Sequence, residues 1–153
     1  KLALLLPQGG EIKEALVEEH TGISKDFNSF ELLAALIQKD HLKANRIVNY
    51  FEANPKNNPL VLTISGLFKY FLNLLTYHYQ KKTTPNAQEM AKLLGVHPFF
   101  MKDYTEGSRV YNAVKCANII SLLREYDMKS KGVGNANISD GELLKELVFK
   151  IMH

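Results

Sequence analysis

The stretch NSFELLAALIQKDHLKANRIVNYFEANP, from Asn28 to Pro55, contains two helical patterns in direct succession. Asn28 is a favourable helix cap, and Glu31 three residues later gives the spacing of a capping box. Asp40 is placed to cap the second helix, and Pro55 ends it. The expected apolar faces are Phe30, Leu33, Ala34 and Ile37 in the first helix, and Ala44, Ile47, Val48 and Phe51 in the second. Because almost no linker separates them, we expect an antiparallel pair.

The same signals continue along the chain. Asn58 as cap and Pro59 at the first helical position open a helix that runs to about Gln80. Thr84 and Pro85 have the same predicted roles in the next helix, which ends at Gly95, and a short helix follows Pro98. A long helix is expected from Ser108 to about Lys131. Its two apolar stripes predict packing on two sides: Ala113, Cys116, Ala117, Ile120 and Leu123 in one, and Ile119, Leu122 and Tyr126 in the other.

The glycine-rich segment KGVGNANISDG separates this helix from the last one. Ser139 and Glu142 form a second capping box, followed by an apolar stripe of Leu144, Leu147, Val148 and Ile151. No segment alternates like a β-strand. The sequence therefore predicts an all-α helical bundle of about seven helices.

The composition predicts a globular protein with a sizeable core. The 153 residues are 46% hydrophobic and 23% charged, with a net charge of +3 from 19 basic and 16 acidic residues. This balance permits nucleic acid nearby without demanding it. The opening KLALLLPQGG has no initiator methionine, and its short apolar run reads as the end of a helix from a longer protein. The apolar segment around Leu60–Gln80 has Lys69 at its centre, which favours a buried helix over a membrane span.

No constellation indicates an enzyme, a metal site or a cofactor. The five histidines are scattered, and none forms a spaced pair with a second zinc ligand. The segment GVGNAN lacks the Lys-Ser/Thr of a phosphate-binding loop. A single cysteine, Cys116, excludes an internal disulfide framework and suits a reducing cytoplasm. Because nothing nearby would lower its pKa, Cys116 is expected to be a small buried hydrophobe rather than a nucleophile.

Residues 87–111, AQEMAKLLGVHPFFMKDYTEGSRVY, have the rhythm of a DNA-reading helix-turn-helix. A reading helix carries polar side chains at its start, where they meet the base edges. Here Pro98, Phe99, Phe100 and Met101 occupy those positions, and Lys102, Asp103 and Glu106 give the second helix a charge of −1. The motif is therefore expected to be a packing unit. Basic residues gather at Lys81 and Lys82, at Lys129 and Lys131, and at Lys145 and Lys150, and the first two pairs suit solvated helix ends.

Five segments, in order, resemble the C-terminal domain of the bacterial DNA polymerase III delta subunit. They are SFELLAALIQKDHLKANRIVNYF, NPLVLTISGLFKYFLNLL, TPNAQEMAKLLGVHPFFMKDY, CANIISLLREYDMKSKG and SDGELLKELVFKIM. The third is the most specific, and the aromatic Tyr70 and Phe71 depart from the pattern. The leading LALLLPQGGEIKEALVEEHTG resembles the tail of the preceding lid domain. Residues 1–25 are accordingly assigned to an AAA+-like lid tail with a short helix, and residues 26–153 to the helical collar domain.

This resemblance implies a subunit of the sliding-clamp loader, in the cytoplasm at the replisome. In that family five subunits join through their C-terminal domains into a collar, and the N-terminal module of delta binds the clamp. The resemblance implies that this chain is a non-catalytic assembly domain whose partners are delta prime and gamma/tau, with no cofactor and no membrane. The proposed interface residues are Phe99, Phe100 and Tyr104, as exposed aromatics, together with Asp127 and Lys129, which equally suit a helix end that fixes the following loop or a solvated surface.

Two alternatives remain open at this stage. One is a DNA-binding module that uses the helix-turn-helix or the lysines, and DNA contact within a whole complex is also open. The other is a fragment that pairs with its own copy.

Overall fold

The computed structural model describes residues 27–134 and 137–153, and these residues fold into an all-α bundle with no strand, as predicted. The lid tail predicted for residues 1–25 lies outside the described residues. The helices are α2 (Ser29–Gln38), α3 (His41–Ala53), α4 (Leu60–Gln80), α5 (Ala87–Leu94), the 3₁₀ helix η2 (Pro98–Phe100), α6 (Met101–Val110), α7 (Ala113–Ser130) and α8 (Asp140–Met152).

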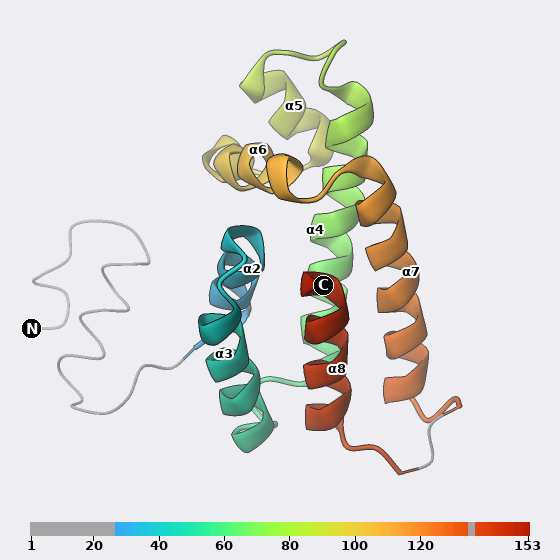
Figure 1. Cartoon of the computed structure of the whole chain (residues 1–153). Coiled ribbons are helices and arrows are strands. Elements are labelled where there is room, and N and C mark those ends of the chain that lie inside the picture. Colours follow the sequence, from blue (N-terminus) through green and yellow to red (C-terminus); the bar gives the residue numbers. More distant parts are fainter. Residues whose placement is uncertain (1–26, 135–136) are drawn as a thin grey trace, which may run out of the picture.

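Two antiparallel helices, α4 and α7, form the longest packed pair and run the height of the bundle (Figure 1). The hairpin of α2 and α3 packs beside them, and α8 lies against α3 and α7. The short helices α5 and α6 cover one end, where α4 finishes and α7 begins (Figure 1). Because α4 contacts helices on several sides, it connects the two ends of the domain.

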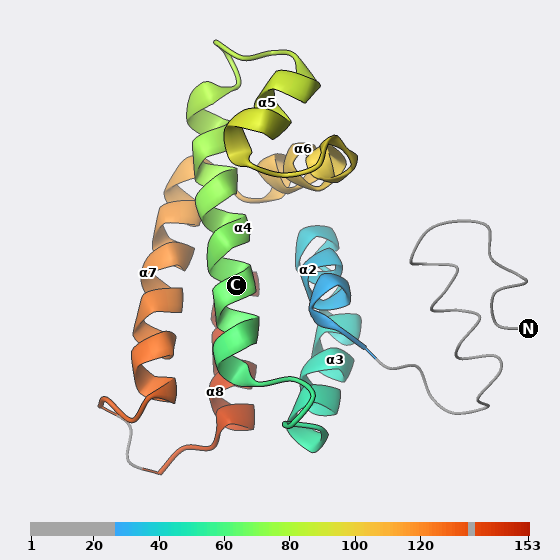
Figure 2. The same ribbon diagram turned by 180° about the vertical axis from the view of Figure 1, so that it is seen from behind.

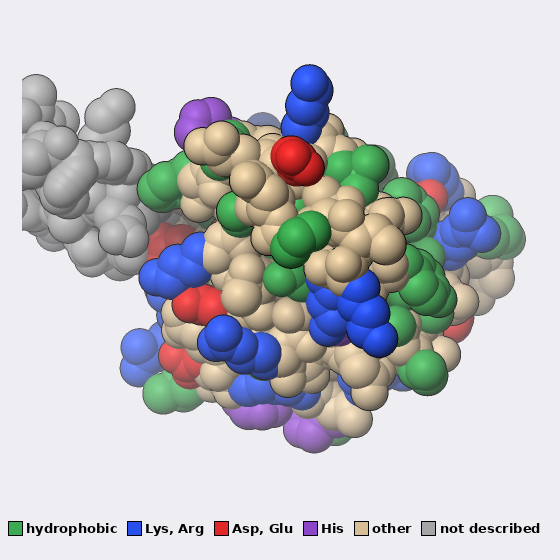
Figure 3. Space-filling model, turned by 90° about the horizontal axis from the view of Figure 1, so that it is seen from above, with side chains coloured by type: hydrophobic (Ala, Val, Ile, Leu, Met, Phe, Trp, Pro, Cys, Tyr) green, Lys and Arg blue, Asp and Glu red, His purple; other side chains and the backbone are tan. Residues whose placement is uncertain are grey.

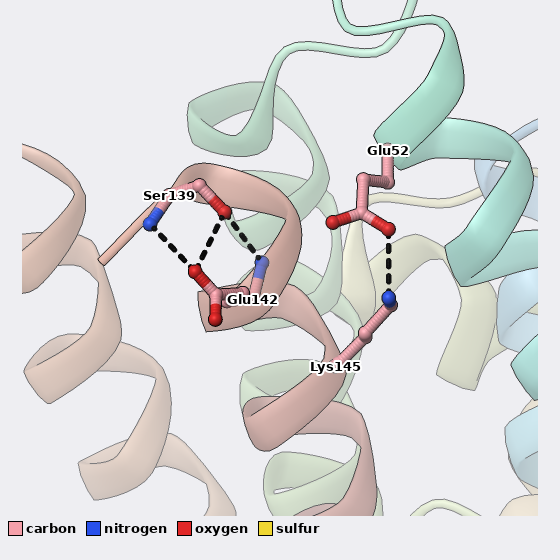
Figure 4. Close-up of polar contacts among 4 residues, drawn as sticks. All are labelled: Glu52, Ser139, Glu142 and Lys145. Carbon is pink, nitrogen blue, oxygen red and sulfur yellow. Dashed lines mark hydrogen bonds and ion pairs between the residues drawn. The ribbon is translucent and has the colours of Figure 1, made fainter.

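Most of the predicted caps are present. The side chains of Asn28 and Asp40 accept hydrogen bonds from the backbone N–H groups of the third helical residues of α2 and α3. At the start of α8, Ser139 and Glu142 form the predicted reciprocal box, which satisfies two of the otherwise unpaired N–H groups of that helix end (Figure 4). Nearby, an ion pair of 2.7 Å between Glu52 and Lys145 connects α3 to α8 (Figure 4).

Two caps were predicted at the wrong residue. The helix α4 begins at Leu60 with Pro59 as its cap residue, while Asn58 donates to the carbonyl of Asn54 instead. The helix α5 is capped by Asn86, whose side chain accepts from two backbone N–H groups, and not by Thr84. In both places the proline lies just outside the helix. The residue with the extended backbone is Pro59 itself at the start of α4, and Asn86, which follows Pro85, at the start of α5.

The predicted apolar faces of α3 and α8 are confirmed, since every residue named for them is buried. The face predicted for α2 is only partly correct, because Ile37 is buried and Leu33 packs against the core as predicted, whereas Phe30 does not enter it. Phe30 is 72% exposed, and the residues that enter the core are Leu32, Ala35, Leu36 and Ile37. The face of α2 that enters the core is therefore rotated about the helix axis relative to the predicted face.

The long helix predicted from Ser108 is interrupted. The helix α6 continues to Val110, the chain bends at Tyr111, and Asn112 caps a new helix by accepting from the N–H of Lys115. The helix α7 does pack on two neighbours, α4 and α8, as predicted. Its buried residues are Cys116, Ile119, Leu123 and Tyr126, whereas Ala117 is exposed.

The apolar helix α4 is long and apolar enough to cross a membrane by length and composition. In the structure it contributes one face to the core through Leu60, Thr63, Ile64, Leu67, Tyr70, Phe71 and Leu74. The predicted burial of this helix holds for one face only, because its other side exposes Val61, Leu62, Leu72 and Tyr79.

Candidate functional site

The five residues predicted to form an interface lie in two separate places. Phe99, Phe100 and Tyr104 belong to the end of the bundle covered by α5 and α6, whereas Asp127 and Lys129 lie in the last turn of α7. In Figure 1 the last turns of α7 point away from α5 and α6. The structure therefore does not bring the five residues together in one site.

The turn between α5 and η2 is fixed by three local features. Gly95 ends α5 with φ of 72°, in the left-handed region that glycine adopts without a Cβ penalty. His97 is extended, and its Nδ1 accepts a hydrogen bond of 3.0 Å from the N–H of Phe99. Pro98 then occupies the first position of η2, where its missing N–H has no cost. These features hold the backbone that carries the two phenylalanines.

Phe99 and Phe100 project from this turn into solvent. Phe99 is 77% exposed and Phe100 is 37% exposed, and their rings meet edge to face with centroids 5.3 Å apart. Leu93 on the neighbouring α5 is also exposed. We call Leu93, Phe99 and Phe100 the α5–η2 corner. Figure 3 looks down on this end of the bundle and shows hydrophobic side chains beside lysine and arginine side chains, with fewer acidic ones.

Tyr104 is part of the core, so the expectation of an exposed aromatic there is wrong. Its exposed fraction is 5%, and its ring stacks on Tyr70 with centroids 4.9 Å apart. Its hydroxyl accepts a hydrogen bond from the Asn73 side chain, and burial raises the pKa of the hydroxyl. Tyr104 therefore packs α6, the helix that follows the corner, against α4.

Asp127 and Lys129 form local contacts at the end of α7. Asp127 pairs with Lys131 at 2.9 Å, and Lys131 is the residue that ends the helix. Lys129 pairs with Glu125 at 3.0 Å, a contact that raises the pKa of Lys129, and its ammonium lies 4.5 Å from the centre of the Tyr126 ring. Exposed pairs of this kind add little stability. These contacts suit the expected role in fixing the start of the following loop.

Within residues 27–134 and 137–153, no three His, Cys, Asp or Glu side chains are grouped so that they could hold a metal ion. Cys116 is fully buried on α7 beneath the carbonyl of Tyr111, and burial raises its pKa to about 11. A thiol with this pKa holds almost no thiolate at neutral pH, so it is a poor nucleophile.

The reactivity of Cys116 gives a direct check of its burial. In the native chain at pH 8, Cys116 should react with Ellman's reagent more than about 100-fold more slowly than in urea, because the thiolate is scarce and the sulfur is covered. The rate should still be low at pH 9, where an exposed thiol is largely ionised. The reaction is followed by the absorbance of the released thiolate of the reagent. Complete labelling within minutes under native conditions would contradict the prediction.

The start of the second helix does not suit a DNA-reading helix-turn-helix. The second helix begins with η2, and the side chains at its start are the exposed rings of the α5–η2 corner followed by the buried Met101. Aromatic rings in this place offer no hydrogen bonds to base edges. Nothing in the described geometry favours a DNA-reading helix here.

The chain was compared with known families and structures. The family model for the DNA polymerase III delta subunit, C-terminal domain, matches residues 26–149. The chain belongs to this family. The family assignment supports a clamp-loader setting for this chain. The comparison with curated protein sequences gave no match.

This chain resembles a solved structure of the Bacillus subtilis DNA clamp loader delta protein, with a TM-score of 0.68 and 17% sequence identity. The alignment covers 90% of this chain and 40% of the B. subtilis chain. This chain therefore spans well under half the length of that protein. At this identity the likeness shows the fold, and it agrees with the all-α architecture.

Proposed function

We propose that this domain joins a delta subunit to its neighbours in the clamp loader. In this role the domain performs no chemistry, and the partners are the C-terminal domains of delta prime and gamma/tau in a cytoplasmic replisome. The residues 26–153 would form the collar domain, and the preceding residues the end of a lid domain. The observation that carries the proposal is the exposed pair of phenylalanines at the α5–η2 corner.

Exposed aromatic rings on a fixed turn suit a protein interface. Burying a ring such as Phe99 contributes about 1.5–3 kcal/mol, and aromatic residues are enriched in the centres of interfaces. The His97 cap fixes the backbone N–H of Phe99, and the edge contact with Phe100 restrains the Phe99 ring, so less side-chain entropy is lost when a partner covers it. Lys92 and Lys102, which are exposed and close to the corner in the sequence, would contribute to the polar rim.

The effect of Phe99→Ser on assembly tests this proposal. The full chain is mixed with the C-terminal domains of delta prime and gamma/tau from the same genome, and the mass of the complex is measured by light scattering on a sizing column. Phe99→Ser should weaken the complex by about tenfold or more, as expected for an aromatic residue at an interface centre. The thermal midpoint should not fall, because the ring is 77% exposed.

A matched control is available on α8. Phe149 is 61% exposed and stacks on His153, with centroids 4.1 Å apart, so Phe149→Ser removes a comparable exposed ring at a different place. This variant should assemble like the unaltered chain. If the unaltered chain and its neighbours elute separately at concentrations where the neighbours pair with each other, the assembly role is wrong.

A further inference from the structure

A second apolar surface runs along the side of α4 that does not enter the core. Val61 and Phe68 are seven residues apart, which is about two helical turns, and Phe68, Leu72, Leu75 and Tyr79 follow at intervals of three or four residues, so these five residues form one stripe. Val61, Leu72 and Tyr79 are 43%, 45% and 71% exposed, while Phe68 and Leu75 are half-buried. At a rise of 1.5 Å per residue the stripe is about 27 Å long.

The neighbouring helix α7 continues this surface. Val114 and Met128, separated by four turns, are 70% and 52% exposed, and the small Ser121 lies midway between them. The Arg124 guanidinium lies 5.9 Å from the centre of the Phe68 ring, so this side chain of α7 borders the α4 stripe where the two packed helices meet. In Figure 2 α4 lies in front of α8, and no described helix covers its outer side.

We call the surface formed by Val61, Leu72, Tyr79, Val114 and Met128 the α4/α7 face. Two exposed cations lie about halfway along its length: Lys69 on α4, one residue after Phe68 and so at the flank of the stripe, and Arg124 on α7. Among the described residues neither cation has an ion-pair partner, and the adjacent Glu125 is already paired with Lys129. The face is therefore apolar along its length and positive at its centre.

We propose that the α4/α7 face binds an acidic, amphipathic helix of a neighbouring clamp-loader subunit. This inference rests on the proposed assembly role and names the surface and the chemistry of one partner. The partner helix presents apolar side chains to the α4 stripe and places Asp or Glu side chains opposite Lys69 and Arg124. Such complementarity selects the right partner and fixes its register.

The central position of the cations argues against a second copy of this chain as the partner. Two copies related by a two-fold axis place the middle of one face against the middle of the other. Lys69 and Arg124 would then meet the same cations of the other copy, and like charges at an interface are unfavourable. A subunit held between two different neighbours also needs two different surfaces, and the α4/α7 face is separate in sequence and in helices from the α5–η2 corner.

The test uses the full chain, the same two neighbour domains, and titration calorimetry. Lys69→Glu should weaken binding by about tenfold or more, because it sets like charges against each other in a partly desolvated interface. Lys69→Arg should bind like the unaltered chain. Lys56→Glu is the matched control, because it makes the same change of charge at an exposed loop lysine between α3 and α4. Leu72→Ser tests the apolar stripe and should also weaken binding.

Each remaining outcome overturns the inference in a distinguishable way. If the complex forms and Phe99→Ser weakens it while Lys69→Glu and Leu72→Ser do not, the α4/α7 face is wrong and the assembly role stands. If the unaltered chain binds neither neighbour, both are wrong. If the chain alone has twice its monomer mass and Leu72→Ser abolishes this, the occupant is a second copy. If Lys69→Glu removes binding to a labelled DNA duplex but leaves assembly intact, the cations serve nucleic acid.

Discussion

Replacing Tyr111 with alanine should lower the free energy of unfolding by about 3–5 kcal/mol, the cost of removing a large buried aromatic ring. Tyr111 has no exposed surface, and its ring meets Phe71 edge to face at 5.3 Å. Its hydroxyl donates a 2.7 Å hydrogen bond to the carbonyl of Leu36, so the residue connects the α6–α7 bend to α2 and α4. Urea unfolding followed by circular dichroism measures the change.

Two further variants separate the ring from the hydroxyl. Tyr111→Phe keeps the ring and should cost only about 1 kcal/mol, because the carbonyl of Leu36 also accepts from the N–H of Lys39. Tyr79→Ala removes a tyrosine that is 71% exposed and should change stability by less than about 0.5 kcal/mol. A loss below about 1 kcal/mol for Tyr111→Ala would show that the bend does not depend on this side chain.

Replacing Gly107 with alanine should destabilise the domain by about 2 kcal/mol. A Cβ at this position of α6 would overlap the hydroxyl of Tyr70. The Tyr70 ring has little freedom to move, because it stacks on Tyr104 and its hydroxyl donates 2.7 Å to the carbonyl of Asp103. The overlap costs about 3 kcal/mol, and the better helix propensity of alanine returns about 1 kcal/mol.

The source of this loss can be tested by removing the obstructing oxygen. Tyr70→Phe alone should cost about 1 kcal/mol, because the carbonyl of Asp103 loses its partner. The double variant Tyr70→Phe with Gly107→Ala should be more stable than the sum of the two losses predicts. Gly66→Ala on α4 is the control, since no atom lies within 4 Å of its added Cβ, and it should not destabilise. Additive losses in the double variant would place the strain elsewhere.

Local signals in the sequence were sufficient where a cap and a single apolar stripe coincide. This holds for α3 and α8, whose caps and buried faces were both predicted. In α2 almost every position is apolar, so two overlapping stripes fit the helical period equally well. Packing against the α3 and α6 neighbours selected the stripe with Leu32 and Leu36, and it left Phe30 in solvent. The spacing of apolar residues within α2 alone cannot decide between the two stripes.

The break at Tyr111 had a signal in the sequence. Asn112 is a favourable cap followed by a helical pattern, but the apolar spacing continues through it and therefore favours one uninterrupted helix. The candidate site was harder, since Tyr104 and Phe99 are both aromatic residues within five positions. One fills the space beside Tyr70 and the other faces solvent. This difference arises from the 3₁₀ turn η2. The α4/α7 face could not be predicted either, because α4 and α7 come from distant segments of the chain.

The pairing of α4 with α7 also has a consequence for how the protein is made. The last residue of α4, Gln80, leaves the ribosome 33 positions before the first residue of α7, Ala113. At about 5–20 residues per second, the nascent α4 waits for several seconds before α7 can cover it. During that interval the growing chain displays a segment as apolar as a membrane span. Because α2 has already emerged, and α5 and α6 emerge next, these three helices that pack on α4 can cover part of it before α7 is made.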